Sequence, residues 1–231
     1  PANHANLDHY KSISARLAHA EGIDEQTARA LSEEGKAVVW IDGGLHATET
    51  LGAHQLTRTM HMLASQTDPE TQRFLDDVII LLAHANPDGM ELVSNWYMRE
   101  RNPEERSYDD IPRLYQKYVG HDNNRDFFMN NMPESKAVAK VIYREWYPQI
   151  VFNHHQTSPP YARIVLPPYS DPLNPAIHPG VTTSVNLVGT AMANRLAMKK
   201  RPGVISYFQY RMWWNGGRRT APYVHNMVGM L

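Results

Sequence analysis

The architecture of this chain can be read from Ala37-Val38-Val39-Trp40-Ile41-Asp42-Gly43-Gly44-Leu45-His46-Ala47-Thr48-Glu49. The first five residues are apolar without a break, which is typical of a buried strand in a sheet covered on both faces. His46 and Glu49 follow at the carboxyl end of this strand, where open α/β sheets build their sites. At this spacing an imidazole and a carboxylate lie on one side of a helical turn and can bind one metal ion. The same spacing occurs in many exposed helices without a metal, so the pair needs support from elsewhere in the chain.

Apolar runs and helical periodicities alternate along the chain. The second apolar run, from Val78 to Ala83, ends at the turn signal Asn86-Pro87-Asp88-Gly89. Strands that alternate with helices indicate an α/β domain of three layers, with a mixed, mostly parallel central sheet flanked by helices. We predict strands over 37–42, 78–83, 149–153 and 204–208, helices over 8–20, 24–34, 49–65, 134–146 and 181–198, a short helix from Asp68, and mostly loop over 90–132 and 158–179.

The composition is that of a globular protein without signs of a nucleic-acid or membrane partner. Of the 231 residues, 42% are apolar and 20% are charged, and the net charge is −1. Lys199-Lys200-Arg201 is too short for the basic stripe of a nucleic-acid-binding surface. No apolar run approaches the roughly 20 residues of a membrane helix. Because the chain has no cysteine, any zinc ion must be bound by histidine and carboxylate side chains.

We expect residues 1–231 to form a single domain that is incomplete at both ends. No linker or repeat divides the chain, and its length suits one sizeable core. It opens at Pro1 without a methionine, so any targeting segment would have been lost. It closes on the apolar run Met227-Val228-Gly229-Met230-Leu231, which is typical of an element interrupted midway.

A pair of histidines at the end of the third predicted strand offers a further metal ligand. The run is Asn153-His154-His155-Gln156, and neighbouring residues of a strand point to opposite faces, so at most one of the two histidines should face a site. With His46 and Glu49, one of them would complete a His-Glu-His set, the pattern of a catalytic zinc ion with one coordination position open for water. A histidine that hydrogen-bonds in the core is the alternative.

Two arginine-containing runs could bind an anionic substrate. Asn124-Arg125 lies in a polar segment, where the planar guanidinium matches a carboxylate bidentately and the asparagine adds neutral donors. Arg99 and Arg101, which follow Trp96-Tyr97-Met98, could place positive charge near a developing oxyanion. A polar turn with a salt bridge, and ordinary surface arginines, are the alternatives at these positions.

The order of these motifs resembles that of the zinc carboxypeptidase family, the carboxypeptidase A-like metallopeptidases. The motifs that carry the resemblance are His46-x-x-Glu49, Asn86-Pro87-Asp88-Gly89, Asn124-Arg125 and the histidine at a strand end. They span residues 37–156, and the resemblance is thinner from 157 to 231. It implies an α/β fold in which helices flank a mixed, mostly eight-stranded sheet.

The resemblance also implies roles for single residues. One Zn²⁺ ion would be bound by His46, Glu49 and a later histidine. The family's later ligand commonly sits two residues after an acidic or amide residue, so Asn153 favours His155, with His154 as the alternative. The other implied positions are Asn124 and Arg125 for the substrate's terminal carboxylate, Arg99 or Arg101 for the oxyanion, and Tyr223, the turn Asn215-Gly216-Gly217 and the Pro-rich loop 159–175 for the walls of the substrate pocket.

Two departures from the family pattern matter. Many members carry arginine immediately before the zinc-binding glutamate, where this chain has Thr48. The chain therefore resembles a divergent bacterial branch, and we expect an exported protein, periplasmic or extracellular. The family's catalytic glutamate comes late in the domain, yet Thr157 to Leu231 contains no glutamate. We expect that residue just beyond Leu231, and we expect this chain itself to be inactive.

The activity that the resemblance implies is that of a zinc-dependent metallocarboxypeptidase, which hydrolyses C-terminal peptide bonds. A zinc amidohydrolase of the same fold, such as a deacylase of N-acyl amino acids, would use the same metal set on a small acidic substrate. A non-catalytic zinc- or peptide-binding domain and an α/β domain without metal are further alternatives. The expected partner of the enzyme is a peptide or a small acyl amino acid, and the sequence does not fix the oligomeric state.

Overall fold

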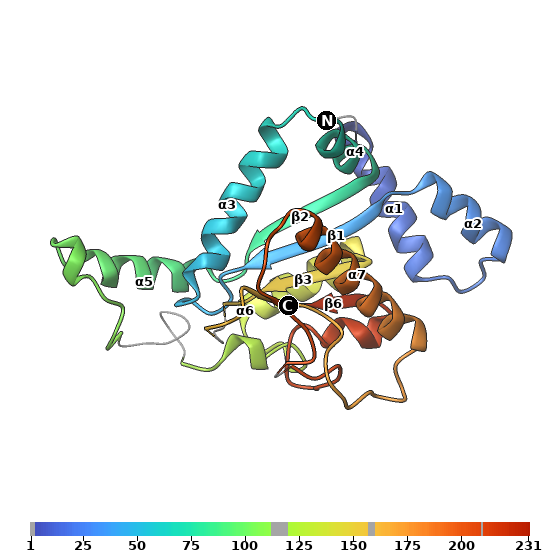
Figure 1. Cartoon of the computed structure of the whole chain (residues 1–231). Helices are drawn as coiled ribbons and strands as arrows, with labels where there is room; N and C mark the ends of the chain where they lie inside the picture. Colours follow the sequence, from blue (N-terminus) through green and yellow to red (C-terminus); the bar gives the residue numbers. More distant parts are fainter. Residues whose placement is uncertain (1–2, 112–119, 157–159, 209) are drawn as a thin grey trace.

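The computed structural model describes residues 3–111, 120–156, 160–208 and 210–231 (Figure 1). The strands are β1 (Ala37–Gly43), β2 (Val78–His84), β3 (Ile150–His154), β4 (Ile164–Val165), β5 (Val204–Ile205) and β6 (Val228–Met230). The helices are η1 (His4–Asn6), α1 (Leu7–Ala18), α2 (Glu25–Glu34), α3 (Thr50–Ser65), α4 (Pro69–Asp77), α5 (Pro87–Met98), η2 (Pro103–Glu105), η3 (Asn123–Arg125), α6 (Pro133–Lys140), the π-helix η4 (Val141–Trp146), α7 (Pro179–Met198) and η5 (Ala221–His225).

A parallel sheet of four strands, in the order β2-β1-β3-β6, forms the centre of the fold. The predicted α/β domain, with a mostly parallel sheet between helices, is confirmed. The described strands pair in parallel throughout, and the central sheet has four strands in the described ranges rather than the eight that the resemblance implied. The predicted strand over 204–208 corresponds to β5, which pairs with β4 in a separate sheet instead of extending the central one.

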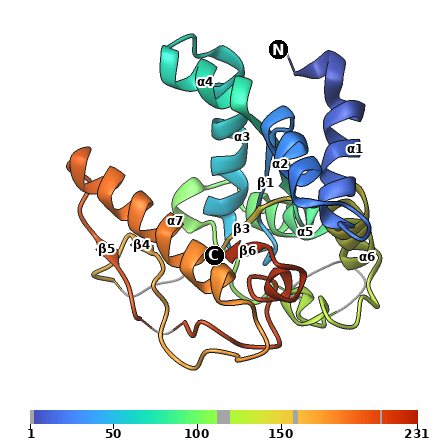
Figure 2. The ribbon, with the colours of Figure 1, turned by 90° about the vertical axis from the view of Figure 1, so that its right-hand side faces the viewer.

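Helices cover both faces of the central sheet. On one face, Trp40 and Val151 pack against Ile142 of η4 and against Met227 in a buried apolar cluster. On the other face, α3 contacts β1 and β2, and α7 contacts β6. Figure 2 shows the strands between α7 on one side and α1 and α6 on the other. Strands covered in this way explain the continuous apolar runs in the sequence. None of the helices in the described ranges is both long and apolar enough to cross a membrane.

The structure corrects the prediction that His46 and Glu49 lie on a helical turn. Residues 46–49 form a turn before the helix, in which the Glu49 N–H donates to the His46 carbonyl oxygen at 3.0 Å. The helix α3 begins at Thr50, and Glu49 is the residue that precedes its first turn. The pair is therefore brought together by the connection between β1 and α3.

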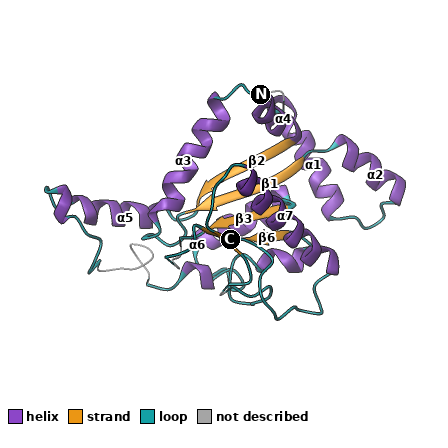
Figure 3. Ribbon diagram, in the orientation of Figure 1, coloured by secondary structure: helices purple, strands orange, loops and turns teal. Residues whose placement is uncertain are grey.

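A second correction concerns the segment 90–132, which was predicted to be mostly loop. Residues 87–98 form α5, because Asn86 caps the helix by accepting from the Gly89 N–H and Pro87 suits the first helical turn. Residues 112–119 lie outside the described part of the chain, as does Pro159 of the predicted loop 158–179. Figure 3 shows loops gathered beside β3 and β6, where the segments around the site lie.

Close backbone contact holds α3 against the end of β1. A Cβ atom added to Gly43 would lie 2.6 Å from the carbonyl oxygen of Gly52, which is far closer than carbon and oxygen pack. The next residue, Gly44, has a φ of +71°, in the left-handed region that favours glycine. These glycines let the chain leave the strand sharply, so that residues 46–49 stay beside the edge of the sheet.

Replacing Gly43 by alanine should lower the free energy of unfolding by about 1–3 kcal/mol, because the added methyl group overlaps the Gly52 backbone and α3 has to shift. Denaturant titration measures this change. Gly120→Ala is the matched control, since a Cβ there meets no atom within 4 Å, and its stability should stay within about 0.5 kcal/mol. Equal stability of the two variants would contradict the tight contact.

Candidate metal centre

The three residues of the predicted zinc set come together at the carboxyl edge of the central sheet. His46 and Glu49 sit in the turn after β1, and His155 is the first residue after β3, the neighbouring strand. Gly43 pairs with His154 at the ends of these two strands. Because the strands are parallel and in this register, the residues just beyond them leave the sheet side by side.

Glu49 bridges the two imidazole rings. Its Oε1 atom lies 2.8 Å from Nδ1 of His46, and its Oε2 atom lies 2.9 Å from Nδ1 of His155. One potential ligand atom from each of the three residues lies within 4.8 Å of the others. Two imidazole nitrogens that face a shared carboxylate are a donor set that zinc takes in catalytic sites. The residues present therefore fit one Zn²⁺ ion.

Polar contacts behind the ligands hold each ring by its other nitrogen. Asp122 Oδ1 lies 3.0 Å from Nε2 of His46, and Asn153 Oδ1 lies 2.8 Å from Nε2 of His155. An acceptor at Nε2 keeps a proton there and leaves Nδ1 as the metal-binding nitrogen. Asp122 was not among the residues predicted for the site. Its place two residues before Asn124-Arg125 was the available signal.

A buried carboxylate holds Asn153 in turn. The Asn153 side-chain amide donates to Asp42, as does the indole N–H of Trp40. Nη2 of Arg218 lies 2.9 Å from Oδ2 of Asp42, and both of these charged side chains are almost completely buried. Asp42 was also missed in the sequence, where it is the charged residue at the end of an apolar strand. This network connects the candidate ligand His155 to β1 and to the segment before β6.

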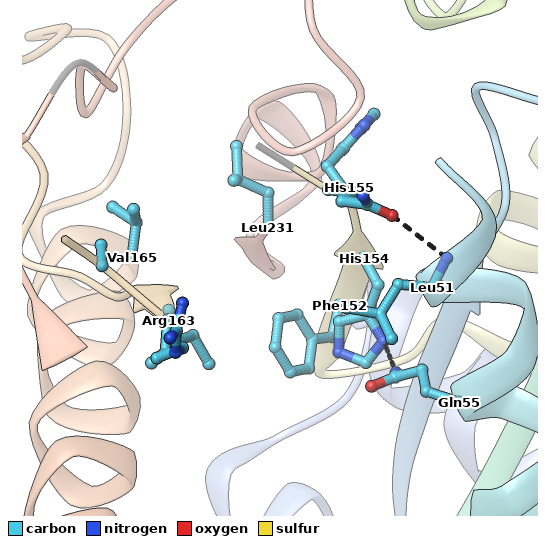
Figure 4. A pocket seen from close by; sticks show the side chains of 12 residues that line it. Leu51, Gln55, Phe152, His154, His155, Arg163, Val165 and Leu231 are labelled. Carbon is cyan, nitrogen blue, oxygen red and sulfur yellow. Dashed lines mark hydrogen bonds between the residues drawn. The ribbon is translucent and has the colours of Figure 1, made fainter. Parts of the chain in front are cut away.

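His154 points away from the cluster, as the alternation along a strand requires. Figure 4 shows its ring directed at Gln55, while His155 points the opposite way. The Gln55 side chain hydrogen-bonds to Nδ1 of His154, and both residues line a neighbouring cavity of about 190 Å³, which His155 also lines. Burial lowers the pKa of His154 to about 4, so its ring is neutral at physiological pH. The geometry favours His155, not the alternative His154, as the metal ligand.

Hydrogen bonds within the cluster shift the pKa values of Glu49 and His46 in opposite directions. Burial opposes the ionisation of Glu49, but hydrogen bonds from His155 and His46 outweigh it and lower the pKa of Glu49 to about 2. Burial also opposes the protonated form of His46, but its hydrogen bonds to Asp122 and Glu49 prevail and raise its pKa to about 9. At neutral pH Glu49 is a carboxylate and His46 an imidazolium, so a metal ion that binds here must displace a proton from His46.

A cavity of about 220 Å³ opens beside the cluster and has Asn124 and Arg125 in its wall. The Asn124 side-chain oxygen accepts from the Arg218 N–H at 2.8 Å, and its amide nitrogen lies 3.1 Å from Nε2 of His155. The Arg125 guanidinium packs 4.4 Å from the centre of the Trp214 ring. The cavity therefore joins the metal cluster to the pair predicted to bind a carboxylate.

The structure does not bring Arg99 or Arg101 to this cavity. Arg99 directly follows α5, with its guanidinium 3.3 Å from the centre of the Trp96 ring, and Arg101 is exposed beyond it. Figure 1 shows α5 projecting away from the sheet. At about 1.5 Å per residue, Arg99 lies roughly 20 Å along the helix from Asn86. The helical conformation of 87–98 thus carries both arginines away from the cluster.

The residues near the end of the chain that were predicted to line the substrate pocket lie partly in the core and partly in the cavity wall. Tyr223 is buried in an apolar cluster with Tyr169 and Val185, and its hydroxyl donates to the Gly229 carbonyl oxygen at 3.1 Å. It packs in the core and does not line the cavity, whereas Gly217 of the predicted wall turn does. Two further wall residues, Arg218 and Arg219, were not identified as site residues in the sequence, where an arginine pair after two glycines was the available signal.

Comparison with known proteins agrees with this metal cluster. A family model described as zinc carboxypeptidase matches residues 11–201, a range that contains His46, Glu49 and His155. Carboxypeptidase B of Helicoverpa zea is 34% identical over 115 residues, which are 48% of this chain and 25% of that protein. The chain thus spans about a quarter of the length of this curated relative.

Replacing His155 by alanine should weaken zinc binding by more than about 100-fold, because a direct ligand is lost and not merely an outer partner. Competition with a chromophoric chelator measures the affinity. His154→Ala is the matched control, since that ring faces Gln55 on the other side of the strand and zinc affinity should stay within about threefold. Similar losses in both variants would contradict the assignment.

Zinc affinity should rise about tenfold per pH unit from about pH 6 to 8 and level off near the His46 pKa of about 9, because one proton leaves His46 when the metal binds. The same chelator titration at several pH values measures the slope. In Asp122→Asn the levelling should begin at lower pH, since Asp122 is one of the groups that raise the pKa of His46. A flat profile would exclude proton displacement.

Proposed function

Because this chain belongs to the zinc carboxypeptidase family, we propose that it provides the zinc-binding and substrate-binding part of a metallocarboxypeptidase that hydrolyses C-terminal peptide bonds. The observation that carries the proposal is the cavity in which His46, Glu49 and His155 lie beside Asn124 and Arg125. Family membership supports a hydrolase of the peptidase class with one Zn²⁺ ion. What we propose beyond the family is that the cleaved bond lies at the C-terminus of the substrate.

His46, Glu49 and His155 would hold the zinc ion. Three protein ligands are the number found in catalytic zinc sites, whereas structural sites have four. When bound, zinc supplies a Lewis acid that polarises a carbonyl group and lowers the pKa of a water molecule to about 7. Asp122 and Asn153 keep the imidazole rings oriented by their outer nitrogens, so the chain itself fixes the direction from which the ligands approach.

Asn124 and Arg125 would bind the substrate's terminal carboxylate. Asn124 is held by the backbone N–H of Arg218, and Arg125 is held by the face of Trp214, so both groups are positioned before a substrate arrives. A guanidinium beside an amide offers several N–H donors to one carboxylate. The cavity of about 220 Å³ is smaller than the roughly 300–1,000 Å³ of drug-sized ligand sites, which suits one terminal residue.

The described walls do not supply a group for proton transfer. A general base has to lie within hydrogen-bond distance of the attacking water. Among the described residues that line the cavity, Glu49 is the one carboxylate, and metal ligation occupies it. Arg99 and Arg101 do not line the cavity as the structure describes it, and their role at the oxyanion stays a prediction. This chain would therefore bind zinc and substrate without turnover.

A deacylase of N-acyl amino acids is the second candidate, and the small volume of the cavity favours it as well. It would use the same metal set and would bind the carboxylate of its amino acid through Arg125. Substrate length separates the two enzymes, because a carboxypeptidase binds a dipeptide unit and a deacylase needs a single acyl amino acid. The third alternative is a domain that binds zinc without catalysis. A longer protein that carries the general base would hydrolyse neither peptides nor acyl amino acids in that case.

The zinc-loaded chain should bind a short acylated peptide with a free C-terminal carboxylate at least tenfold more tightly than the same peptide amide, since a carboxylate gains charge-assisted hydrogen bonds from Arg125 (about 1.5–3 kcal/mol). Calorimetry measures both affinities, and Arg125→Gln should remove the difference. Arg29→Gln is the matched control, because Arg29 forms an exposed ion pair with Glu25. No product should appear during the titration.

Equal binding of acid and amide would count against carboxylate recognition. Hydrolysis that disappears in His46→Ala would contradict the expectation of an inactive chain. Tight binding of N-acetylleucine with no gain from a preceding residue would favour the deacylase.

A further inference from the structure

Arg219 is a buried cation that has no anionic partner in the described part of the chain. Its side chain lines the cavity beside the metal cluster, and the residue is 6% exposed. No carboxylate lies within ion-pair distance of its guanidinium among the residues that the structure describes, and Nη1 makes no hydrogen bond there. A buried charge without a partner destabilises a protein by several kcal/mol. The missing counter-ion is therefore the feature of this cavity that needs an explanation.

The neighbours of Arg219 are aromatic rings that stay neutral. Its guanidinium lies 5.0 Å from the centre of the Tyr169 ring and 5.8 Å from that of Tyr210. Burial raises the pKa of Tyr169 to about 12 and also raises the pKa of Tyr223, which neighbours Arg219 as well. Neither hydroxyl can ionise at physiological pH to balance the arginine. Cation–π contact with neutral rings stabilises the arginine, but it does not neutralise its charge.

Arg218 shows what a structural arginine looks like in the same wall. It is 1% exposed, and its Nη2 atom lies 2.9 Å from the buried carboxylate of Asp42. The chain itself thus neutralises Arg218, and this residue serves the network behind His155. Among the described residues Arg218 has a carboxylate partner and Arg219 has none, whereas both guanidinium groups carry nitrogen atoms without a hydrogen-bond partner.

The backbone of Arg219 is fixed by close packing. A Cβ atom added to Gly229 of β6 would lie 1.7 Å from the Arg219 carbonyl oxygen, so the segment can lie on the strand because Gly229 has no side chain. Thr220, the next residue, is 1% exposed. The position from which the Arg219 side chain enters the cavity is therefore set by the packing of its backbone on β6.

We propose that Arg219 binds a second anionic group of the substrate, so that the cavity selects molecules whose C-terminal residue is itself acidic. This inference rests on the proposed function, in which Arg125 takes the terminal carboxylate. The side-chain carboxylate of a terminal glutamate or aspartate would then be the counter-ion that the described residues do not supply. The same chemistry would select an N-acyl dicarboxylic amino acid if the enzyme were a deacylase.

The test compares free amino acids, which occupy the position of the released product, on the zinc-loaded chain. L-Glutamate should bind at least about tenfold more tightly than L-glutamine, which has nearly the same shape without the charge. In Arg219→Gln the ratio should fall to about one, while glutamine binding persists and shows that the cavity is intact. Arg219→Lys should keep part of the preference, and Arg195→Gln, on a surface ion pair with Glu70, should keep all of it. Calorimetry gives the four ratios.

The outcomes separate this inference from the proposed function. Equal affinity for glutamate and glutamine in the unchanged chain, with both weakened in Arg125→Gln, overturns the role of Arg219 and leaves the carboxypeptidase proposal in place. A preference that survives in Arg219→Gln assigns it to another group and also overturns the inference. Absence of binding for glutamate, glutamine and leucine alike overturns both.

Discussion

The carboxylate of Asp42 is the group on which the arrangement of this site depends. It lies buried at the end of β1, accepts hydrogen bonds from Trp40 and Asn153, and pairs with Arg218 at 2.9 Å. One anion thus connects two neighbouring strands with the segment that precedes β6. Loss of one partner from a buried ion pair destabilises by about 3–5 kcal/mol, because the other charge stays buried alone. Since Asn153 also holds His155, a candidate metal ligand is positioned from inside the fold.

The arginines around the cavity differ in whether a carboxylate of the chain neutralises them. Arg218 is neutralised within the chain, and Arg125 lies 3.6 Å from Asp122, which also contacts His46. Arg219 has tyrosine rings for neighbours instead of a carboxylate. A bound zinc ion would add to the positive charge of these arginines, and a concave positive site attracts anionic molecules before contact.

The parts of the fold that were predictable are those with a local signal. Continuous apolar runs located β1, β2 and β3, and the alternation of neighbouring residues along a strand anticipated that His154 and His155 would face opposite ways. Asn86-Pro87 was ambiguous, because the same residues start a turn or cap a helix, and the choice of a loop misplaced the segment that carries Arg99. Asp42, Asp122, Arg218 and Arg219 gain their roles from contacts between distant segments, which no local pattern encodes. Tyr223 shows the same limit, since packing alone decides whether an aromatic ring lines a pocket or fills a core.

Glu49 joins His46 and His155 through hydrogen bonds that belong to the chain itself. Small zinc modules of the finger type collapse into their structure when the ion arrives, so their synthesis is tied to zinc supply. Here a parallel sheet and a bridging carboxylate assemble the ligands during folding. Zinc binding at this site would therefore call for the release of a proton rather than for folding of the chain.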